Sequence, residues 1–355
     1  MPPDHHTRPG LSHGPAAIDR PTVSFELFPP RTPQATADLW RTVEALAAVR
    51  PDFISVTYGA SGSTRATTRD LVRRLLAETS VLPIAHLTCV GATRGELVRV
   101  IEEFLDEGVR TFLALRGDPP AGSPGWAPHP GGLTRASELV ELLREVETAR
   151  CGSSASQALR GAAHKMSIAV AAFPTGHAGP GSVAERRARD LQSLLAKQEA
   201  GADFAITQVF FEPETYLDLV RDARALGITI PILAGVIPAT DPARLLRVEQ
   251  LTGVTVPADL LGRLLATDDE DERHRIGTRA SVDLANAVLD GGAPGLHVYT
   301  FNRHRAALAL VEGAGLADAP VAGPSRPLGP PSPSGTATAG VAVHRPHDLE
   351  TQGAP

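Results

Sequence analysis

VSFELFPPR, residues 23–31, is the stretch from which both the fold and the chemistry of this chain are best approached. Its first half alternates and is rich in strand formers. The strand must end at Pro29 and Pro30, because proline lacks the N–H that a sheet ladder needs and restricts the residue before it. Glu26 therefore lies near the carboxyl end of a short apolar strand. A carboxylate is costly to bury there unless it is paired or used, so an ion pair with an arginine, a solvated strand end and a functional carboxyl are the alternatives.

Outward from this stretch, strand and helix signals alternate along the chain. We expect strands at residues 23–27, 53–57, 83–88, 111–115, 167–172, 204–207, 232–236 and 296–299. We expect helices at residues 35–49, 68–78, 93–107, 136–147, 183–200, 214–226, 241–252, 258–265, 270–290 and 303–312. Eight strand–helix pairs with buried-type strands predict an α/β fold, a single-domain (β/α)8 TIM barrel with an extra helical elaboration before the last strand. A doubly wound open sheet is the alternative, but no G-x-G-x-x-G motif follows the first strand.

The composition excludes several classes of protein. The chain has 355 residues, of which 42% are hydrophobic, enough for one large core. A net charge of −6 argues against a protein that binds the nucleic-acid backbone. Two cysteines, Cys89 and Cys151, cannot form a disulfide framework or a multi-thiolate zinc site. No apolar run approaches the ~20 residues of a membrane span, and the amino terminus lacks a signal-peptide core. We therefore expect a cytoplasmic protein with small-molecule partners and with neither nucleic-acid nor membrane partners.

The two ends of the chain differ from its centre. Residues 1–20 are rich in proline, glycine and histidine, and residues 317–355 lack any apolar period, so both are predicted to be disordered. Residues 21–316 form the predicted catalytic barrel, in which residues 150–166 are expected to be an inserted surface loop. The exposed faces expected on the outer helices favour a homo-oligomer.

The active site of such a barrel lies at the carboxyl ends of its strands, and unusual polar residues recur there. The strand ends carry Glu26; Thr57 and Tyr58; His86 and Thr88; Arg116, Gly117 and Asp118; Phe173 and His177; Thr207 and Gln208; Pro238; and Tyr299, Asn302 and Arg303. Each alone is a weak signal, since a lone histidine in an apolar strand is more often a hydrogen-bonded core residue. Together they favour an active site.

Two further patterns stay open on the residues alone. Asp190 and Lys197 are two turns apart on one helix face, which suits contacts to a ribityl or phosphate group or an ordinary solvated face. No ligand set with metal-binding spacing is evident, and a metal held by His86, His177 and Asp118 is the less favoured alternative.

Six motifs, in order, carry a family resemblance. They are VSFELFPPR, FISVTYGA, AHLTC, LALRGDPP, AITQVFF and HVYTFNR. Over residues 21–316 the sequence closely resembles 5,10-methylenetetrahydrofolate reductase of the bacterial type, with the catalytic domain only. The resemblance implies FAD bound non-covalently at the top of a (β/α)8 barrel. It also implies a ping-pong reaction, in which NADH or NADPH reduces the flavin and leaves, and methylenetetrahydrofolate is then reduced to 5-methyltetrahydrofolate. Such a reaction belongs to one-carbon metabolism and methionine supply.

The resemblance also implies roles for individual residues. Glu26 matches the general acid that protonates the outer nitrogen of the folate five-membered ring, and Asp118 matches the carboxylate between flavin and pterin. The positions that match flavin contacts are Thr57, Tyr58, Ala60, His86, Arg116, Gly117, Asp118, Ala136, Phe173, His177, Asp190, Ser193 and Lys197. Asp118, Gln208, Arg244 and Arg303 match substrate contacts.

Several positions depart from the family pattern. Phe173 stands for a tyrosine, and Ser193 and Ala196 stand for an asparagine and an arginine near the adenylate end of the flavin. Arg244 stands for a glutamine that contacts folate, and Val248 for a stacking phenylalanine. These departures keep a different flavin or deazaflavin oxidoreductase open as an alternative. A metal-dependent lyase and a silent folate-binding paralogue are the others.

Overall fold

The computed structural model of this chain describes residues 20–30, 32–57, 65–118, 129–151, 165–177 and 180–317. The expected amino-terminal arm, inserted loop and carboxyl-terminal tail fall outside these ranges, except for a few residues at their borders. Tyr58 and Ala60 fall outside them too.

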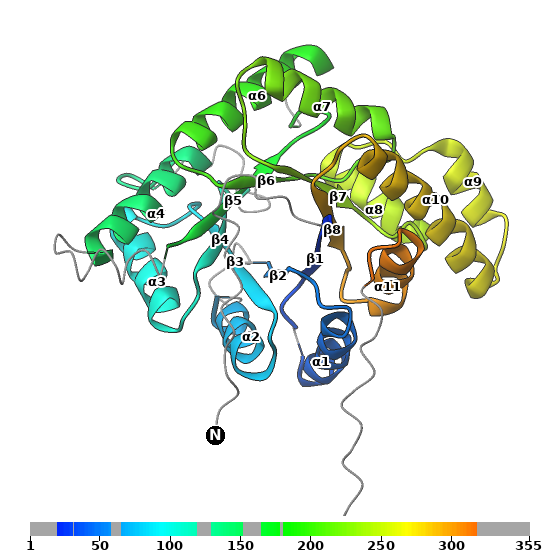
Figure 1. Ribbon diagram of the computed structural model, residues 1–355, viewed down its shortest axis with the longest axis horizontal. Helices are drawn as coiled ribbons and strands as arrows, with labels where there is room; N and C mark the ends of the chain where they lie inside the picture. Colours follow the sequence, from blue (N-terminus) through cyan, green and yellow to red (C-terminus); the bar gives the residue numbers. More distant parts are fainter. Residues whose placement is uncertain are drawn as a thin grey trace, which may run out of the picture. The chain divides into compact units, whose positions relative to one another are not determined.

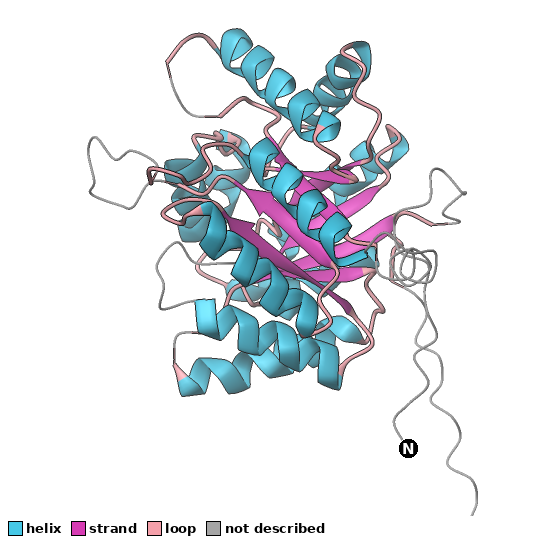
Figure 2. Cartoon of the chain, turned by 90° about the vertical axis from the view of Figure 1, so that its left-hand side faces the viewer, coloured by secondary structure: helices cyan, strands magenta, loops and turns pink. Residues whose placement is uncertain are grey.

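Eight parallel strands close into a barrel within the described residues (Figures 1 and 2). They are β1 (Thr22–Leu27), β2 (Phe53–Val56), β3 (Leu82–Thr88), β4 (Thr111–Leu115), β5 (Ser167–Ala172), β6 (Phe204–Thr207), β7 (Ile232–Val236) and β8 (Gly295–Tyr299). Each strand pairs with the next along the chain, and β8 pairs with β1. The predicted TIM barrel is confirmed, and the open sheet is excluded.

Helices surround the strands (Figure 1). They are α1 (Pro33–Ala47), α2 (Arg65–Glu78), α3 (Arg94–Asp106), α4 (Ala136–Cys151), α6 (Val183–Glu199), α7 (Pro213–Ala225), α8 (Pro242–Thr252), α9 (Ala258–Leu265), α10 (Glu270–Asp290) and α11 (His304–Gly313). Helix α3 begins with the capping box that Thr93 and Glu96 predict. Helices α9 and α10 precede β8, so the expected helical elaboration is also confirmed.

The interior of the barrel has an apolar part and a polar part. One buried cluster packs Phe53, Ile84, Leu113, Ala169, Phe204, Ile206 and Leu233 together. Next to this cluster, the strand registers pair Ser24 with His297, and Glu26 with both Ser55 and Tyr299. Because side chains alternate along a strand, these polar residues lie on the inner face of β8, β1 and β2.

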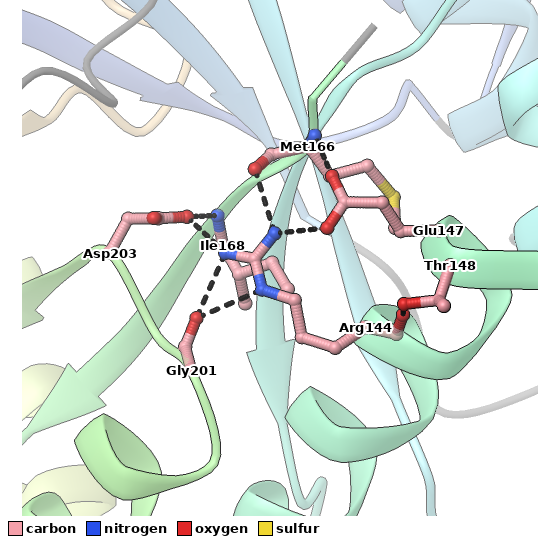
Figure 3. A network of polar contacts seen from close by, with 7 residues as sticks. All are labelled: Arg144, Glu147, Thr148, Met166, Ile168, Gly201 and Asp203. Carbon is pink, nitrogen blue, oxygen red and sulfur yellow. Dashed lines mark hydrogen bonds and ion pairs between the residues drawn. The ribbon is translucent and has the colours of Figure 1, made fainter. Parts of the chain in front are cut away.

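The amino ends of β5 and β6 are tied together by Arg144 of α4 (Figure 3). Its guanidinium donates to the carbonyl oxygens of Met166 and Gly201 and forms ion pairs of 2.7 Å with Glu147 and 2.6 Å with Asp203. The two carboxylates also accept backbone N–H groups, Glu147 from Met166 and Asp203 from Ile168. We call this set the Arg144 cluster.

No helix in the described ranges is both long and apolar enough to span a lipid bilayer.

Candidate active site

Glu26 lies inside the barrel near the carboxyl end of β1 and is 7% exposed. Its Oε2 is 3.5 Å from Nε2 of His86 on β3 and 3.8 Å from Nε2 of His297 on β8. Among the described residues, neither arginine nor lysine forms an ion pair with it. Its backbone carbonyl accepts a 2.6 Å hydrogen bond from the hydroxyl of Thr300, which fixes the strand just after β8 against β1.

His86 is a neutral neighbour of this carboxyl. Burial lowers the pKa of His86 to about 4, although Glu26 opposes the shift, and His297 adds to it. Its Nε2 atom is buried and has no hydrogen-bond partner within the described residues. A buried polar atom without a partner is rare and marks a place to look for function. A neutral imidazole also gives Glu26 no positive charge to pair with.

His297 is the residue of this cluster that we did not anticipate from the sequence. It is fully buried, with its ring 5.8 Å from that of Phe53 and 5.3 Å from that of Tyr299. A signal was available: His297 is two residues before Tyr299, so both side chains point into the barrel. Tyr299 itself donates a 2.7 Å hydrogen bond to the carbonyl of Thr207 across the barrel. Burial, then Glu26, raises the pKa of Tyr299 well above its ordinary value.

A second cluster of predicted residues lies where the end of β5 meets α6. The ammonium of Lys197 is 2.9 Å from the carbonyl oxygen of Ala171 and 5.9 Å from the ring of Phe173. The rings of Phe173 and His177 meet edge to face at 4.8 Å. The carboxylate of Asp190 accepts the backbone N–H of His177. Asp190 also lies close enough to Lys197 to interact with it electrostatically, as their spacing on one helix face predicts.

Lys197 is charged in spite of its surroundings. It is 7% exposed, and burial lowers its pKa to about 8, with Asp190 raising and Arg116 lowering it. An amine this buried is normally matched by an anion. Asp190 supplies one negative charge nearby, and the repulsion from Arg116 shows that two cations face the same region.

The end of β4 carries Arg116, Gly117 and Asp118. Gly117 has φ of +83°, and a Cβ there would meet the side chain of Val90 at 2.6 Å, so glycine is required. Arg116 and Asp118 are both exposed. Within the described residues Asp118 forms no ion pair with Arg116, which removes the simplest structural role for this carboxylate.

The mouth of β8 is held by a reciprocal pair of hydrogen bonds. The side chain of Asn302 accepts the N–H of Phe28 at 2.8 Å and donates to its carbonyl oxygen at 2.9 Å. Phe301 and Asn302 both have positive φ, and the ring of Phe301 stacks on Phe28 at 5.8 Å. The guanidinium of Arg244 lies over the ring of Phe301, 4.8 Å from its centroid.

Arg244 of α8 and Arg303, which follows Asn302, belong to one positive region. Burial, then Arg303, lowers the pKa of Arg244, and Asp241 at 3.6 Å opposes the shift. Val248, one turn further along α8, is buried. The two arginines predicted to contact substrate therefore lie within electrostatic reach of each other, at the end of β8.

The remaining predicted residues are less closely joined. Gln208 is half-buried at the end of β6, and its side-chain oxygen accepts the N–H of Val209. Thr57 accepts a 2.9 Å hydrogen bond from Thr68 at its carbonyl oxygen. Ala136 is buried at the start of α4, and Ser193 is exposed on α6.

Comparison with known proteins identifies the family. The sequence profile described as methylenetetrahydrofolate reductase matches residues 14–315. This chain belongs to the methylenetetrahydrofolate reductase family. It is 32% identical over 295 residues to 5,10-methylenetetrahydrofolate reductase of Escherichia coli, which covers 83% of this chain and 90% of the relative. It is 30% identical to the probable methylenetetrahydrofolate reductase (NADH) of Oryza sativa, over 89% of this chain and 52% of the relative.

A solved structure shares the barrel fold of this chain. One is an uncharacterised Clostridium thermocellum protein that binds two copies of 5-methyl-5,6,7,8-tetrahydrofolic acid. It matches with a TM-score of 0.52 at 14% identity, over 83% of this chain and 93% of that one. At this identity the likeness concerns the barrel alone. Membership of the family makes the chain an oxidoreductase of the methylenetetrahydrofolate reductase class, as the sequence motifs predict.

Proposed function

We propose that this protein reduces 5,10-methylenetetrahydrofolate to 5-methyltetrahydrofolate in a ping-pong reaction, with NADH or NADPH as donor and non-covalent FAD as carrier. The observation that carries the proposal is Glu26, a buried carboxyl between two histidines at the catalytic end of the barrel, in a chain of this family. The relatives named as NADH enzymes favour NADH as the donor.

The described residues fit a flavin dinucleotide. Lys197 and Arg116 bring two positive charges within electrostatic reach of each other, which suits a phosphate, and Nε2 of His86 makes no hydrogen bond within the described residues. Gly117 allows a ring or chain to approach the backbone closely. When bound, FAD would supply the acceptance and donation of hydride, for which proteins have no side chain. Lys197, Arg116, His86 and the β4 end would hold it.

Glu26 would supply the proton. Reduction of the folate requires the five-membered ring to open, and the outer ring nitrogen leaves as an amine only if a proton reaches it. Glu26 is a suitable donor of that proton, because it is buried at the carboxyl ends of the strands and forms no ion pair with arginine or lysine among the described residues. The carbon left behind is then an iminium carbon that accepts hydride. Transfer of hydride from the nicotinamide to the flavin needs no such proton.

The arginines and Asp118 would bind and orient the substrate. Arg244 and Arg303 form the positive region at the end of β8, which suits the carboxylates of the folate tail. Asp118 is exposed and unpaired among the described residues, which leaves it available to accept hydrogen bonds from the edge of a pterin. Gln208, at the end of β6, would contact both the folate and the nicotinamide in turn.

Separate measurement of the two half-reactions tests the assignment. In Glu26→Gln we expect the folate step to fall ~10²–10⁴-fold, the usual contribution of a general acid. Flavin reduction by NADH should change less than about tenfold, or ~1.4 kcal/mol in the barrier. Stopped-flow absorbance of the flavin under anaerobic conditions follows both steps.

The matched control is Glu147→Gln, which alters a part-buried carboxylate of the Arg144 cluster instead. It should lower stability and leave both half-reactions of the folded protein unchanged. Equal slowing of both half-reactions in Glu26→Gln, with loss of flavin, would show that Glu26 is a structural residue.

A further inference from the structure

Two consecutive residues after β8 hold a backbone conformation that residues other than glycine rarely adopt. Phe301 has φ of +51°, and Asn302 has φ of +58°. Asparagine is tolerated in this left-handed region, whereas a bulky residue such as phenylalanine is strained there. Such strain persists only where the surrounding structure imposes it, and it is concentrated at active sites and ligand clamps. Both residues follow the carboxyl end of β8, at the end of the barrel that carries the candidate site.

The contacts of Asn302 with Phe28 impose this conformation. The side-chain amide of Asn302 bonds the N–H of Phe28 at 2.8 Å and its carbonyl oxygen at 2.9 Å. The ring of Phe301 lies on that of Phe28, with the ring planes at 20° to each other. Phe301 also packs against the apolar cluster that contains Leu245 and Val248 of α8. Its ring therefore has a fixed place between the end of β1 and α8.

The guanidinium of Arg244 is the other neighbour of this ring. It lies 4.8 Å from the ring centroid, and the side chain is 23% exposed. Among the described residues, Arg244 has one ion-pair partner, Asp241, at 3.6 Å, which is too long for a hydrogen bond. A guanidinium that stacks on a ring uses its flat face, and its N–H groups stay available in its plane. Arg244 thus has donors to offer to a ligand.

The donors of Arg244 suit an anion, and a planar carboxylate matches the edge of a guanidinium best. Arg303 is exposed and close enough to lower the pKa of Arg244, so the ligand faces two positive charges. The glutamate at the end of the folate carries two carboxylates. A phosphate of the nicotinamide dinucleotide is the other anion of the proposed reaction, and the two half-reactions distinguish them.

We propose that Phe301 is a positioning residue for the folate substrate: its fixed ring holds the guanidinium of Arg244 in the orientation that binds a carboxylate of the folate tail. The proposal rests on the proposed function, in which Arg244 binds that tail. A ring that touches no reacting atom would then determine how strongly the enzyme prefers a folate with a charged tail. Leucine at this position would fill the space but would offer no aromatic face to the cation.

A matched pair of ligands tests the role of the ring without turnover. They are 5-methyltetrahydrofolate and the same molecule with both tail carboxylates converted to amides. Titration calorimetry gives the Kd of each, and we expect the wild type to prefer the charged ligand ~10-fold or more. Phe301→Leu keeps the apolar bulk, and in it this preference should fall ~3–10-fold. An unchanged preference would overturn the proposal.

Arg244→Gln completes a double-mutant cycle. It should lower the preference for the charged ligand, and Phe301→Leu should lower it no further in that background. An equal effect of Phe301→Leu with and without Arg244 would show that the ring acts by packing alone, which contradicts the proposal. If Phe301→Leu does not fold, Asn302→Gly takes its place, because glycine accepts the positive φ and removes the contacts with Phe28. The same loss of preference is expected in it, and an unchanged preference has the same meaning as above.

The matched control is Trp40→Leu, which removes another ring that stacks with a guanidinium. The guanidinium of Arg74 on α2 lies 3.7 Å from the ring centroid of Trp40 on α1. Its loss should leave the preference for the charged ligand unchanged.

Kinetics separate the folate tail from the dinucleotide. Phe301→Leu should raise the KM for methylenetetrahydrofolate without lowering kcat, since binding is lost equally in the ground and transition states. The KM for NADH in flavin reduction should stay the same. An equal rise in the KM for NADH would assign Arg244 to a phosphate of the dinucleotide and overturn the proposal. If Glu26→Gln fails to slow the folate step selectively, the proposed acid falls, and the calorimetric preference still decides the role of Phe301.

Discussion

The Arg144 cluster and the group formed by Glu26, His86 and His297 place carboxylates at opposite ends of the strands, the first between α4 and the loops before β5 and β6, the second inside the barrel. In the first, the guanidinium meets two carboxylates and two carbonyl oxygens, and those carboxylates also accept backbone N–H groups. In the second, within the part of the chain that the structure describes, Glu26 has no arginine or lysine partner, and Nε2 of His86 makes no hydrogen bond although it lies 3.5 Å from Glu26. Saturated polar groups fix a structure, whereas unsatisfied ones cost stability and are kept where chemistry needs them. The difference therefore separates an end whose polar groups are paired from the end at which the catalytic residues are proposed.

The largest effect on stability should come from Arg144→Met. Removal of the guanidinium leaves Glu147 and Asp203, whose side chains are 15% and 14% exposed, without their cation. Breaking a fully buried pair costs ~3–5 kcal/mol of unfolding free energy, and partial exposure places the expected loss near the lower end, at ~3 kcal/mol. Urea titration at 15 °C measures the loss, and the half-reactions per folded molecule should be unchanged. The control Arg221→Met removes an exposed pair with Asp218 and should cost less than about 0.5 kcal/mol. A loss below ~1 kcal/mol for Arg144→Met would remove the contrast between the two ends.

The second effect is a pH dependence of the unfolding free energy, which His86 beside Glu26 should cause. His86 has a pKa of about 4 in the folded protein against 6.5 ordinarily, so between these values the unfolded chain binds more protons. Stability is therefore lost as the pH falls from 6.5 to 4, by about 3 kcal/mol from this group alone. Urea titrations across this window should show a shallower loss in His86→Gln than in the wild type. Parallel curves for the two proteins would mean that His86 is charged in the native state.

The smallest effect is a gain in stability, which we expect when Lys197 is replaced. Lys197 holds a positive charge in a buried position, and its pKa of about 8 means that the charge destabilises the apoprotein below that pH. Lys197→Met should raise the unfolding free energy by ~1 kcal/mol at pH 7, after allowance for the lost hydrogen bond to Ala171. The gain should shrink from pH 8 to 10.5, where the wild-type ammonium is itself lost. FAD affinity should fall about tenfold or more.

Lys165 is the only other lysine of the chain and is exposed, so Lys165→Met is the control for both measurements. Neither the stability nor the FAD affinity should change in it. If Lys197→Met lowered the stability of the apoprotein, Lys197 would belong with the structural groups at the other end.

The sequence predicts the barrel well because strand alternation and the proline stop after Glu26 are local signals. It also places Glu26, His86, Lys197 and Asp190 at strand ends or on one helix face, where the structure finds them. It does not reveal His297, because a single histidine in an apolar strand looks like core until the register with Ser24 is known. The Arg144 cluster is equally hidden, since it joins α4 to loops before β5 and β6 that lie up to 59 residues away. The roles of the site residues stay predictions.

The seam between β1 and β8 has a consequence for the order in which the site is made. Asn302 and Thr300 clasp residues 274 positions earlier, Phe28 and Glu26, and His297 meets Ser24 across the same seam. The ribosome synthesises Glu26 in the first strand and His297 in the last, so Glu26 meets His297 only after nearly the whole barrel has been synthesised. Contacts so distant in sequence form late in folding. An unfinished chain thus contains Glu26 before its neighbours on β8 have been made, and the candidate site is complete only when β8 pairs with β1.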